Sequence, residues 1–136
     1  MGVKVTHDGS AITIQAPEEL LPVEVNLASS PDLFPVLAVL CAFAKGQSIL
    51  RGAPQLIHKE SNRIEKTAQL LGAALIKCTQ KPDGIHIVGE GKDLRPGSFT
   101  FDPDQDHRMA MAAALFKLKG FDVEIKNPQV VTKSYP

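Results

Sequence analysis

Charged and polar side chains gather where the sequence predicts that helices begin. Lys59, Glu60, Ser61, Asn62 and Arg63 follow one another and supply two cations, one carboxylate and two polar groups. The start of a helix carries unpaired N–H groups and the positive end of the helix dipole, so it suits a phosphate or a carboxylate. Arg63 can donate two parallel hydrogen bonds to such an anion, and Lys59 adds a mobile charge. Taken alone, the segment is more often a solvated helix start that Ser61 caps.

Three further places have the same character. Asp106, His107 and Arg108 lead directly into an apolar run, and Asp32 opens an earlier predicted helix. Lys133 follows a short β-branched stretch late in the sequence. Each has an ordinary explanation by itself, because aspartate commonly caps helices and a single lysine is usually a surface residue. A functional reading requires the fold to bring these places together.

Other catalytic patterns are missing from the sequence. His7, His58 and His86 have no metal-binding spacing, and the chain contains no glycine-rich phosphate loop. No Ser-His-Asp or Cys-His arrangement stands out. Cys41 and Cys78 lie in apolar or strand-like segments without a Cys-x-x-Cys spacing, which is typical of buried small hydrophobes in a reducing cytoplasm. The sequence therefore predicts no metal site.

Hydrophobic periodicity predicts alternating strands and helices along the chain. Helices are expected over residues 32–44, 61–71 and 106–118, with Gly46, Gly72 and Gly120 as their stop signals. Strands are expected over residues 3–6, 11–15, 23–27, 48–52, 75–79, 85–88, 98–101, 123–126 and 130–132. This alternation is typical of an α/β (α+β) fold with strands on one side and amphipathic helices on the other.

The order of these elements repeats. Residues 2–5 correspond to 72–75 and residues 31–46 to 105–120, with an insertion around residues 81–83 and in the later loop. Such self-similarity indicates duplicated units that share one core. We expect one partial domain over residues 1–136, with repeat units at about 1–71 and 72–136. The second unit lacks its final helix and the first starts as if a helix had just ended, which is typical of a fragment.

Composition sets outer limits on the function. The chain has 136 residues, enough for one domain with a real hydrophobic core. Its 15 Lys and Arg residues balance 15 Asp and Glu residues, so electrostatics gives no argument for binding nucleic acid or an anionic membrane. No apolar run reaches the length that spans a bilayer, and no signal-peptide pattern opens the chain. We expect a cytoplasmic protein that binds neither nucleic acid nor membranes.

Taken together, the four places resemble the 5-enolpyruvylshikimate-3-phosphate synthase family of enolpyruvyl transferases. The family's Lys-Glu-Ser-Asp-Arg signature is similar to residues 59–63, and its Asp-His-Arg before a small-residue helix is similar to residues 106–114. Its Thr-Lys-Ser-Phe-Pro is similar to residues 132–136, with Tyr135 as the aromatic residue, and its Pro-Asp is similar to residues 31–32. The resemblance implies repeated βαβαββ units, three in each of two domains. This chain would supply about two of the three units of one domain.

The resemblance also implies which residues bind substrate. Arg63, Arg108 and Lys133 would hold the carboxylate and phosphate of phosphoenolpyruvate. Asp32 would contact the ring hydroxyls of shikimate 3-phosphate, and Lys59 would contact substrate nearby. Two anionic substrates need several fixed cations, which agrees with the residue types at these positions.

The implied catalytic residues are Asp32 and Glu60. Asp32 would take the proton from the attacking 5-hydroxyl of shikimate 3-phosphate, and Glu60 would exchange a proton with the enolpyruvyl methylene. The implied reaction is an addition followed by elimination of phosphate, in the pathway to chorismate and the aromatic amino acids, and the family is the target of glyphosate. No metal or organic cofactor is implied. Further substrate-binding and catalytic residues would come from a missing N-terminal portion of the enzyme, so this chain would carry half of the active site and be inactive alone.

Two positions depart from the family pattern. Asn62 replaces the usual aspartate, which predicts an altered placement of Arg63, and Ile57 stands where the family often has an arginine. Both departures favour an alternative function, a non-catalytic anion-binding α/β module derived from the same fold. A third hypothesis, the sister transferase that acts on a UDP-sugar, lacks the Lys-Glu-Ser and Asp-His-Arg motifs. If the chain is a fragment, uncovered apolar faces predict self-association.

Overall fold

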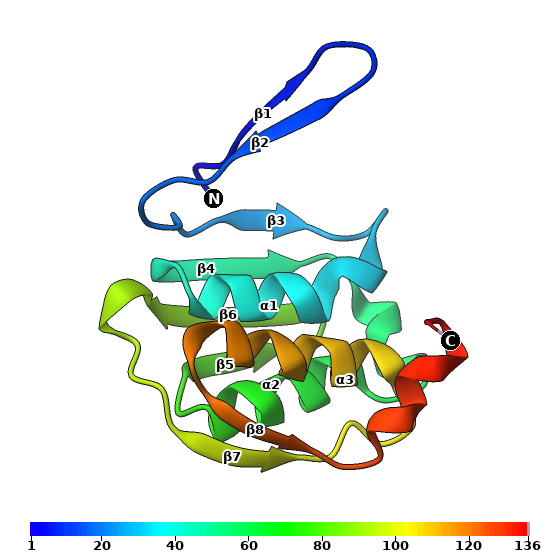
Figure 1. Cartoon of the computed structure of the whole chain (residues 1–136). Coiled ribbons are helices and arrows are strands. Elements are labelled where there is room, and N and C mark those ends of the chain that lie inside the picture. The colour runs from blue at the N-terminus through cyan, green and yellow to red at the C-terminus, as the bar shows by residue number, and fades with distance from the viewer. Residues whose placement is uncertain (136) are drawn as a thin grey trace.

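The computed structural model describes residues 1–135, which form helices and three separate groups of strands (Figure 1). The strands are β1 (Lys4–His7), β2 (Ile12–Gln15), β3 (Glu24–Asn26), β4 (Lys45–Arg51), β5 (Lys77–Lys81), β6 (Gly84–Glu90), β7 (Ser98–Phe101) and β8 (Asp122–Ile125). The α-helices are α1 (Phe34–Ala42), α2 (Arg63–Ala73) and α3 (His107–Ala114). Short 3₁₀ helices cover Pro31–Leu33, Pro54–His58, Gly91–Asp93, Leu115–Lys119 and Pro128–Lys133. The mixed α/β class predicted from the sequence is confirmed.

The strands form one larger sheet and two pairs. The larger sheet has the order β3-β4-β6-β5, with β3 parallel to β4 and β6 antiparallel to both of its neighbours. The other strands form an antiparallel hairpin, β1–β2, and a parallel pair, β7–β8. The three α-helices pack against one another, and they contact both the larger sheet and β7–β8 (Figure 1). The hairpin projects beyond β3, away from the helices. None of the helices in residues 1–135 is both long and apolar enough to cross a membrane.

A cluster of aromatic side chains packs the end of α1 against the end of α3 and against β7. Phe116 lies edge-to-face with Phe43, Phe99 and Phe121, with ring centroids 5.4, 5.6 and 5.2 Å apart. Such edge-to-face pairs contribute about 0.5–1.5 kcal/mol each beyond their buried area. This cluster lies near the C-terminal ends of α1 and α3, so it aligns the two helices and places their N-terminal ends side by side.

Several details of the sequence prediction are wrong, among them the stop signal Gly72, which lies inside α2. The helix expected over residues 32–44 begins as the 3₁₀ turn Pro31–Leu33 and ends at Ala42, whereas its expected stop signal Gly46 lies inside β4. The strand expected over residues 130–132 is part of the 3₁₀ helix Pro128–Lys133. Local bonds outweigh the β-branched propensity there, because Val130 N–H donates to Asn127 O and Ser134 N–H to Val131 O. Pro136, the last residue of the motif predicted at residues 132–136, lies outside the described residues.

The parallel strand pairs have the same topology. β3 leads through α1 to β4, and β7 leads through α3 to β8, with a parallel pair in each case. The correspondence proposed between Gly2 and Gly72 is wrong, since Gly2 matches Leu75 instead: both have positive φ, 77° and 62°, and both precede a hairpin. With this match the offset is 73 at the hairpins, and no insertion near residues 81–83 is needed. The division of the chain into one partial domain with two repeat units stays a prediction.

Leu75 provides a test of this assignment. It is 85% exposed and has a left-handed backbone conformation, which normally favours glycine at the end of a helix. We predict that Leu75→Gly raises the free energy of unfolding in urea by about 1 kcal/mol, because the strain is removed and little packing is lost. The matched control is Leu118→Gly, an exposed leucine inside the 3₁₀ helix Leu115–Lys119, which should lower the same free energy. Loss of stability in both variants would contradict the assignment.

Candidate functional site

The starts of three helices meet at one side of the molecule. Asp32 lies in the 3₁₀ turn before α1, Arg63 is the first residue of α2, and Asp106 is the N-cap of α3. Asp106 accepts hydrogen bonds from Ser61 Oγ, at 3.0 Å, and from Arg108 N–H, at 3.0 Å. A carboxylate at a helix N-terminus is stabilised by the helix dipole as well as by these donors.

Arg63 connects the three helix starts. Its Nε lies 2.7 Å from Asp106 Oδ2 and its Nη2 lies 3.2 Å from Asp106 Oδ1, so the guanidinium holds this carboxylate with two parallel hydrogen bonds. Its Nη1 donates to Asp32 Oδ1 at 2.8 Å. The Arg63 side chain is only 3% exposed and Asp106 is fully buried. The ion pair therefore fixes the start of α2 to the start of α3, and the hydrogen bond from Nη1 holds Asp32 beside them.

Asp32 is surrounded by cations. Besides Arg63, it has Arg108 Nη2 3.2 Å from its Oδ2 and Lys59 Nζ 3.5 Å from its Oδ1. Burial alone would raise the pKa of Asp32, but the charges of Arg108, Arg63 and Lys59 outweigh it and hold the pKa below the usual range. Asp32 is consequently an ionised acceptor at neutral pH.

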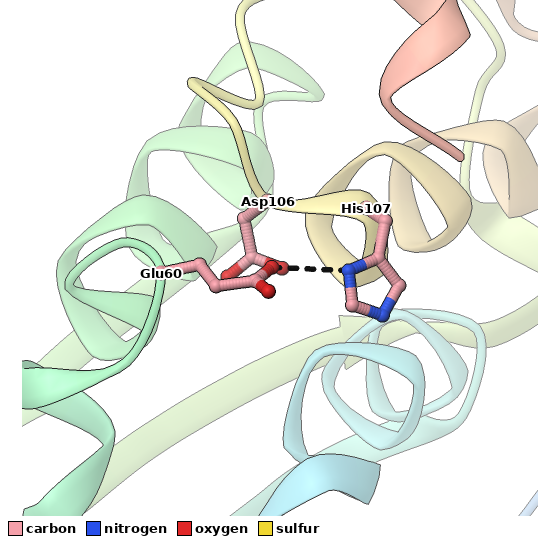
Figure 2. A group of neighbouring side chains, drawn as sticks. All are labelled: Glu60, Asp106 and His107. Atoms are coloured by element: carbon pink, nitrogen blue, oxygen red, sulfur yellow. Dashed lines mark hydrogen bonds and ion pairs between the residues drawn. The ribbon is translucent and has the colours of Figure 1, made fainter. Parts of the chain in front are cut away.

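Glu60 lies beside a second pair of basic groups. Its Oε2 is 3.0 Å from His107 Nδ1 (Figure 2), and its Oε1 accepts a short hydrogen bond from Lys133 Nζ. The bond from Lys133 is the main reason that the pKa of Glu60 is lower than usual, against the opposing effect of partial burial. His107 adds to the lowering. The carboxylates of the site are thus neutralised by its own cations.

These contacts bring together every residue predicted from the sequence to act on substrate. Lys59, Arg63 and Arg108 meet at Asp32, and Lys133 meets Glu60. The two groups adjoin, because ligand oxygens of Glu60 and Asp106 and a ring nitrogen of His107 lie within 4.8 Å of one another. The site is an arrangement of cations and positioned carboxylates that suits anion binding and proton transfer.

Comparison with known proteins decides the family. A family model for EPSP synthase (3-phosphoshikimate 1-carboxyvinyltransferase) matches residues 1–136. The chain belongs to this family. Enzymes named 3-phosphoshikimate 1-carboxyvinyltransferase are 39% identical over 136 residues in Syntrophobacter fumaroxidans and 45% identical over 120 residues in Pyrococcus abyssi. These matches cover 100% and 87% of this chain but 32% and 28% of the relatives, so the chain spans about a third of their length.

A solved structure gives the same result for the fold. EPSP synthase from Acinetobacter baumannii superimposes with a TM-score of 0.80 and 30% sequence identity. The match covers 98% of this chain and 33% of that structure. The predicted resemblance to this family is therefore confirmed, and so is the expectation that the chain corresponds to part of a longer enzyme.

Two lysines of the family motifs, Lys59 and Lys133, occupy equivalent places in the repeat. Lys59 directly follows the 3₁₀ helix Pro54–His58, and Lys133 ends the 3₁₀ helix Pro128–Lys133. Both segments read Pro-Gln, three further residues and lysine, at the same offset of 74 that relates Asp32 to Asp106. Each lysine reaches a carboxylate at a helix start, Asp32 or Glu60. The repeated Pro-Gln spacing is the signal that could have shown this equivalence.

Sequence reasoning also missed the buried partners. Asp106 was expected only to cap a helix, and no role was expected for His107. The cap expected at Ser61 is wrong, because Asn62 caps α2 and Ser61 Oγ donates to Asp106 instead. Asp106 is the counterion of Arg63, and His107 contacts Glu60. Burial of a carboxylate against an arginine 43 positions away has no local sequence signal.

Glu60, Asp106 and His107 are the one group of possible metal ligands found among residues 1–135 (Figure 2). Their ligand atoms are already engaged, because Lys133 donates to Glu60 and Arg63 donates to Asp106. A metal ion would have to displace these cations. The donor set therefore fits a proton-transfer site better than a metal centre.

Asn62, the first departure from the family pattern, has a structural role. Its side-chain oxygen accepts from Glu65 N–H at 3.2 Å and caps α2. Arg63 is held by Asp106 and Asp32, so a carboxylate at position 62 is not needed to anchor it. The predicted change in Arg63 placement stays untested. The second departure, Ile57, is an exposed residue of the 3₁₀ helix Pro54–His58.

The cap can be tested directly. We predict that Asn62→Ala lowers the free energy of unfolding by about 1 kcal/mol, because α2 loses its side-chain cap. Asn62→Asp should keep the cap and the stability, since aspartate is an equally good N-cap residue. Urea unfolding of both variants measures the effect. If Asn62→Asp lowered the free energy of unfolding as much as Asn62→Ala does, the amide would have a role other than capping.

The buried ion pair predicts a pH dependence. The pKa of Asp106 is lowered, because Arg63 and Ser61 outweigh the effect of burial. A lowered folded-state pKa contributes stability above the ordinary value near 3.8, and this contribution is lost as the pH falls through the folded-state pKa. We predict that Asp106→Asn costs about 3–5 kcal/mol at neutral pH, since it leaves Arg63 buried without its main counterion. In chemical unfolding experiments, the difference in the free energy of unfolding between this variant and the unmodified chain should become smaller below pH 4.

An exposed ion pair provides the control. Asp93→Asn removes the partner of Lys45 on the surface, and it should change stability little at any pH. A pH-independent cost for Asp106→Asn would show that packing rather than charge is lost.

Proposed function

We propose that this chain supplies half of an active site that transfers the enolpyruvyl group of phosphoenolpyruvate to the 5-hydroxyl of shikimate 3-phosphate and releases phosphate. The proposal rests on membership of the family and on one structural observation, the convergence of Lys59, Arg63, Arg108 and Lys133 around two carboxylates. Because the chain spans about a third of its relatives, the remaining residues of the site would come from the rest of the enzyme. The chain alone would be inactive.

The cations differ in their access to a ligand. The side chains of Lys133, Arg108 and Lys59 are 60%, 39% and 35% exposed. These three can reach the carboxylate and phosphate of phosphoenolpyruvate, or the phosphorylated substrate in the case of Lys59, by exchanging a protein carboxylate for the ligand. Arg63 is buried, and one side of its guanidinium is occupied by Asp106. We therefore assign its contact with phosphoenolpyruvate to the side that faces Asp32.

The carboxylates would move protons. Asp32, held ionised by its cations, accepts the proton of the 5-hydroxyl as the hydroxyl oxygen attacks the central carbon of phosphoenolpyruvate. Glu60 donates a proton to the methylene carbon, which gives a tetrahedral intermediate. In the second half Glu60 takes a proton back from the methyl group, the double bond re-forms, and phosphate leaves with the proton that Asp32 took up.

Ligand binding would prepare Glu60 for its first step. The contact with Lys133 lowers the pKa of Glu60, so Glu60 is ionised while that contact persists. When Lys133 turns to the ligand phosphate, the pKa of Glu60 rises and the carboxyl group can carry the proton that it donates. Binding of the ligand and conversion of Glu60 to a proton donor are then coupled.

Several features of the whole enzyme belong to the same proposal. The chain's own residues supply the charges and proton acceptors described above, without a metal or organic cofactor in any step. A cytoplasmic location and sensitivity to glyphosate, which resembles phosphoenolpyruvate, would follow from the family. The alternative of a non-catalytic anion-binding module loses one of its arguments, because Asn62 has a structural reason for its identity.

Complementation tests the proposal. Phosphate release from shikimate 3-phosphate and phosphoenolpyruvate is measured with this chain, with the remaining two thirds of a relative such as the Pyrococcus abyssi enzyme, and with both together. We predict turnover only in the combination, and a loss of at least 100-fold in kcat for Glu60→Gln, since a positioned acid or base contributes about 10²–10⁴-fold.

Glu90→Gln is the matched control, because it removes an exposed carboxylate at the end of β6 and should leave kcat unchanged. If both segments fold and associate but give no turnover, the binding-module alternative replaces the transferase.

A further inference from the structure

A second ion pair connects α2 to the loop that precedes α3. Lys66 Nζ lies 2.9 Å from Asp104 Oδ2, and Asp104 is two positions before the N-cap Asp106. Lys66 follows Arg63 by three positions, so both side chains leave the same face of α2. This face of the helix therefore holds the loop at two carboxylates, Asp104 through Lys66 and Asp106 through Arg63.

The pair between Lys66 and Asp104 differs from an ordinary surface ion pair. The Lys66 side chain is only 14% exposed, so its stem is packed against the protein. A lysine that is already packed loses less conformational freedom when a partner holds its ammonium group. Another cation at this loop, Lys126, has an exposed side chain and lies 3.8 Å from Asp102, which is a weak contact. Lys66 is therefore the stronger of these two attachments.

The loop has a backbone conformation that depends on such attachments. Asp104 has φ 53°, in the left-handed region that residues other than glycine rarely adopt. Its N–H donates to Asp102 Oδ1 at 3.0 Å, and Asp106 N–H donates to Pro103 O at 3.1 Å. Strained conformations persist only where surrounding contacts hold them, and they concentrate at functional sites. The ion pair with Lys66 is one of the contacts that hold this loop.

The first repeat unit provides an internal comparison. Ser30 corresponds to Asp104, at the offset of 74 that relates Asp32 to Asp106, and its φ is −144°. The side chain of Asp32 is 45% exposed, whereas that of Asp106 is fully buried. The two equivalent aspartates therefore lie at different depths, and the left-handed turn precedes the buried one.

The residues that follow this loop belong to the candidate active site. Asp106 is the N-cap of α3, and His107 and Arg108 lie in its first turn. His107 contacts Glu60 (Figure 2), and Arg108 contacts Asp32. Because the helix begins where the loop ends, a shift of the loop would move these residues relative to their partners.

We propose that Lys66 is a positioning residue of this site. By pairing with Asp104, it holds the loop over residues 102–106 against α2, which keeps Asp106 buried and fixes the place where α3 begins. Lys66 acts through the loop, so its effect on the reaction should be a change in the binding of phosphoenolpyruvate by Arg108. This effect on the reaction rests on the proposed function, whereas the attachment of the loop does not.

Amide hydrogen exchange in the full chain tests the attachment. Lys66→Met removes the charge but keeps an unbranched side chain and a good helix former. We predict that the N–H groups of Asp106 and Arg108 then exchange faster, and that the factor is at least about three times that for the N–H groups of β4 and β6. Lys66→Arg should restore slow exchange, since it restores the ion pair.

The partner residue is tested in the same way. Asp104→Asn removes the charge, but asparagine tolerates the left-handed conformation, so the backbone of the loop is kept. We predict the same increase in exchange as for Lys66→Met, and no further increase in the double variant. Lys126→Met is the matched control, because it removes the weaker cation at Asp102 and should leave exchange in the loop unchanged.

Steady-state kinetics connects the loop to the reaction. In the combination with the remaining two thirds of a relative, we predict that Lys66→Met raises KM for phosphoenolpyruvate at least about threefold, with kcat and KM for shikimate 3-phosphate within about twofold. Arg108 follows the loop, whereas Asp32 and Lys59, assigned to shikimate 3-phosphate, lie on other segments. Lost stability alone would lower the amount of active enzyme and leave both KM values unchanged. Lys66→Arg should restore KM for phosphoenolpyruvate.

Two results would overturn the proposal. Exchange at Asp106 and Arg108 could rise by no larger factor than in β4 and β6, which would make Lys66 a residue of general stability. KM for phosphoenolpyruvate could also stay unchanged in an active combination that carries Lys66→Met. A combination without turnover would count against the proposed function instead, and the exchange measurement would still decide whether Lys66 positions the loop.

Discussion

The buried ion pair between Arg63 and Asp106 is the interaction on which the site depends. It joins the first residue of α2 to the N-cap of α3, and its third hydrogen bond reaches Asp32 before α1. A buried charge is costly without a partner, so neither residue can be removed without exposing the other to that cost. One guanidinium thereby sets the positions of three helix starts, and the exposed cations are arranged around them.

The cations of the site are paired with carboxylates of the same site. Each substrate-binding cation predicted to face the ligand has a carboxylate partner, either Asp32 or Glu60. An anionic ligand must compete with these carboxylates, and each cation it captures raises the pKa of the group left behind. The same exchange that binds phosphoenolpyruvate would therefore convert Glu60 from a base to an acid. This coupling gives a physical reason for placing proton-transfer groups directly beside binding groups.

Local patterns in the sequence predicted much of this arrangement. The helix starts near Asp32, Ser61 and Asp106 follow from capping residues and apolar periodicity, although Asn62 rather than Ser61 caps α2, and the order of the motifs indicated the family. The 3₁₀ helix Pro128–Lys133 was mistaken for a strand, because Val130 and Val131 favour strands while the bonds that bend the segment are not visible in its composition. The partner of Arg63 was also missed, since contact between residues distant in sequence depends on packing. The sequence comparison matched Gly2 to Gly72 instead of to Leu75, because Leu75 adopts a conformation that glycine usually occupies.

The titration of Glu60 is the most direct test of the coupling between binding and proton transfer. The ¹³C signal of its carboxyl group is followed against pH in the chain combined with the rest of a synthase, with and without phosphoenolpyruvate. The account predicts a pKa below the ordinary glutamate range in the absence of ligand, which rises when phosphoenolpyruvate binds and Lys133 turns to its phosphate. A pKa that stays low or falls further on binding would contradict it.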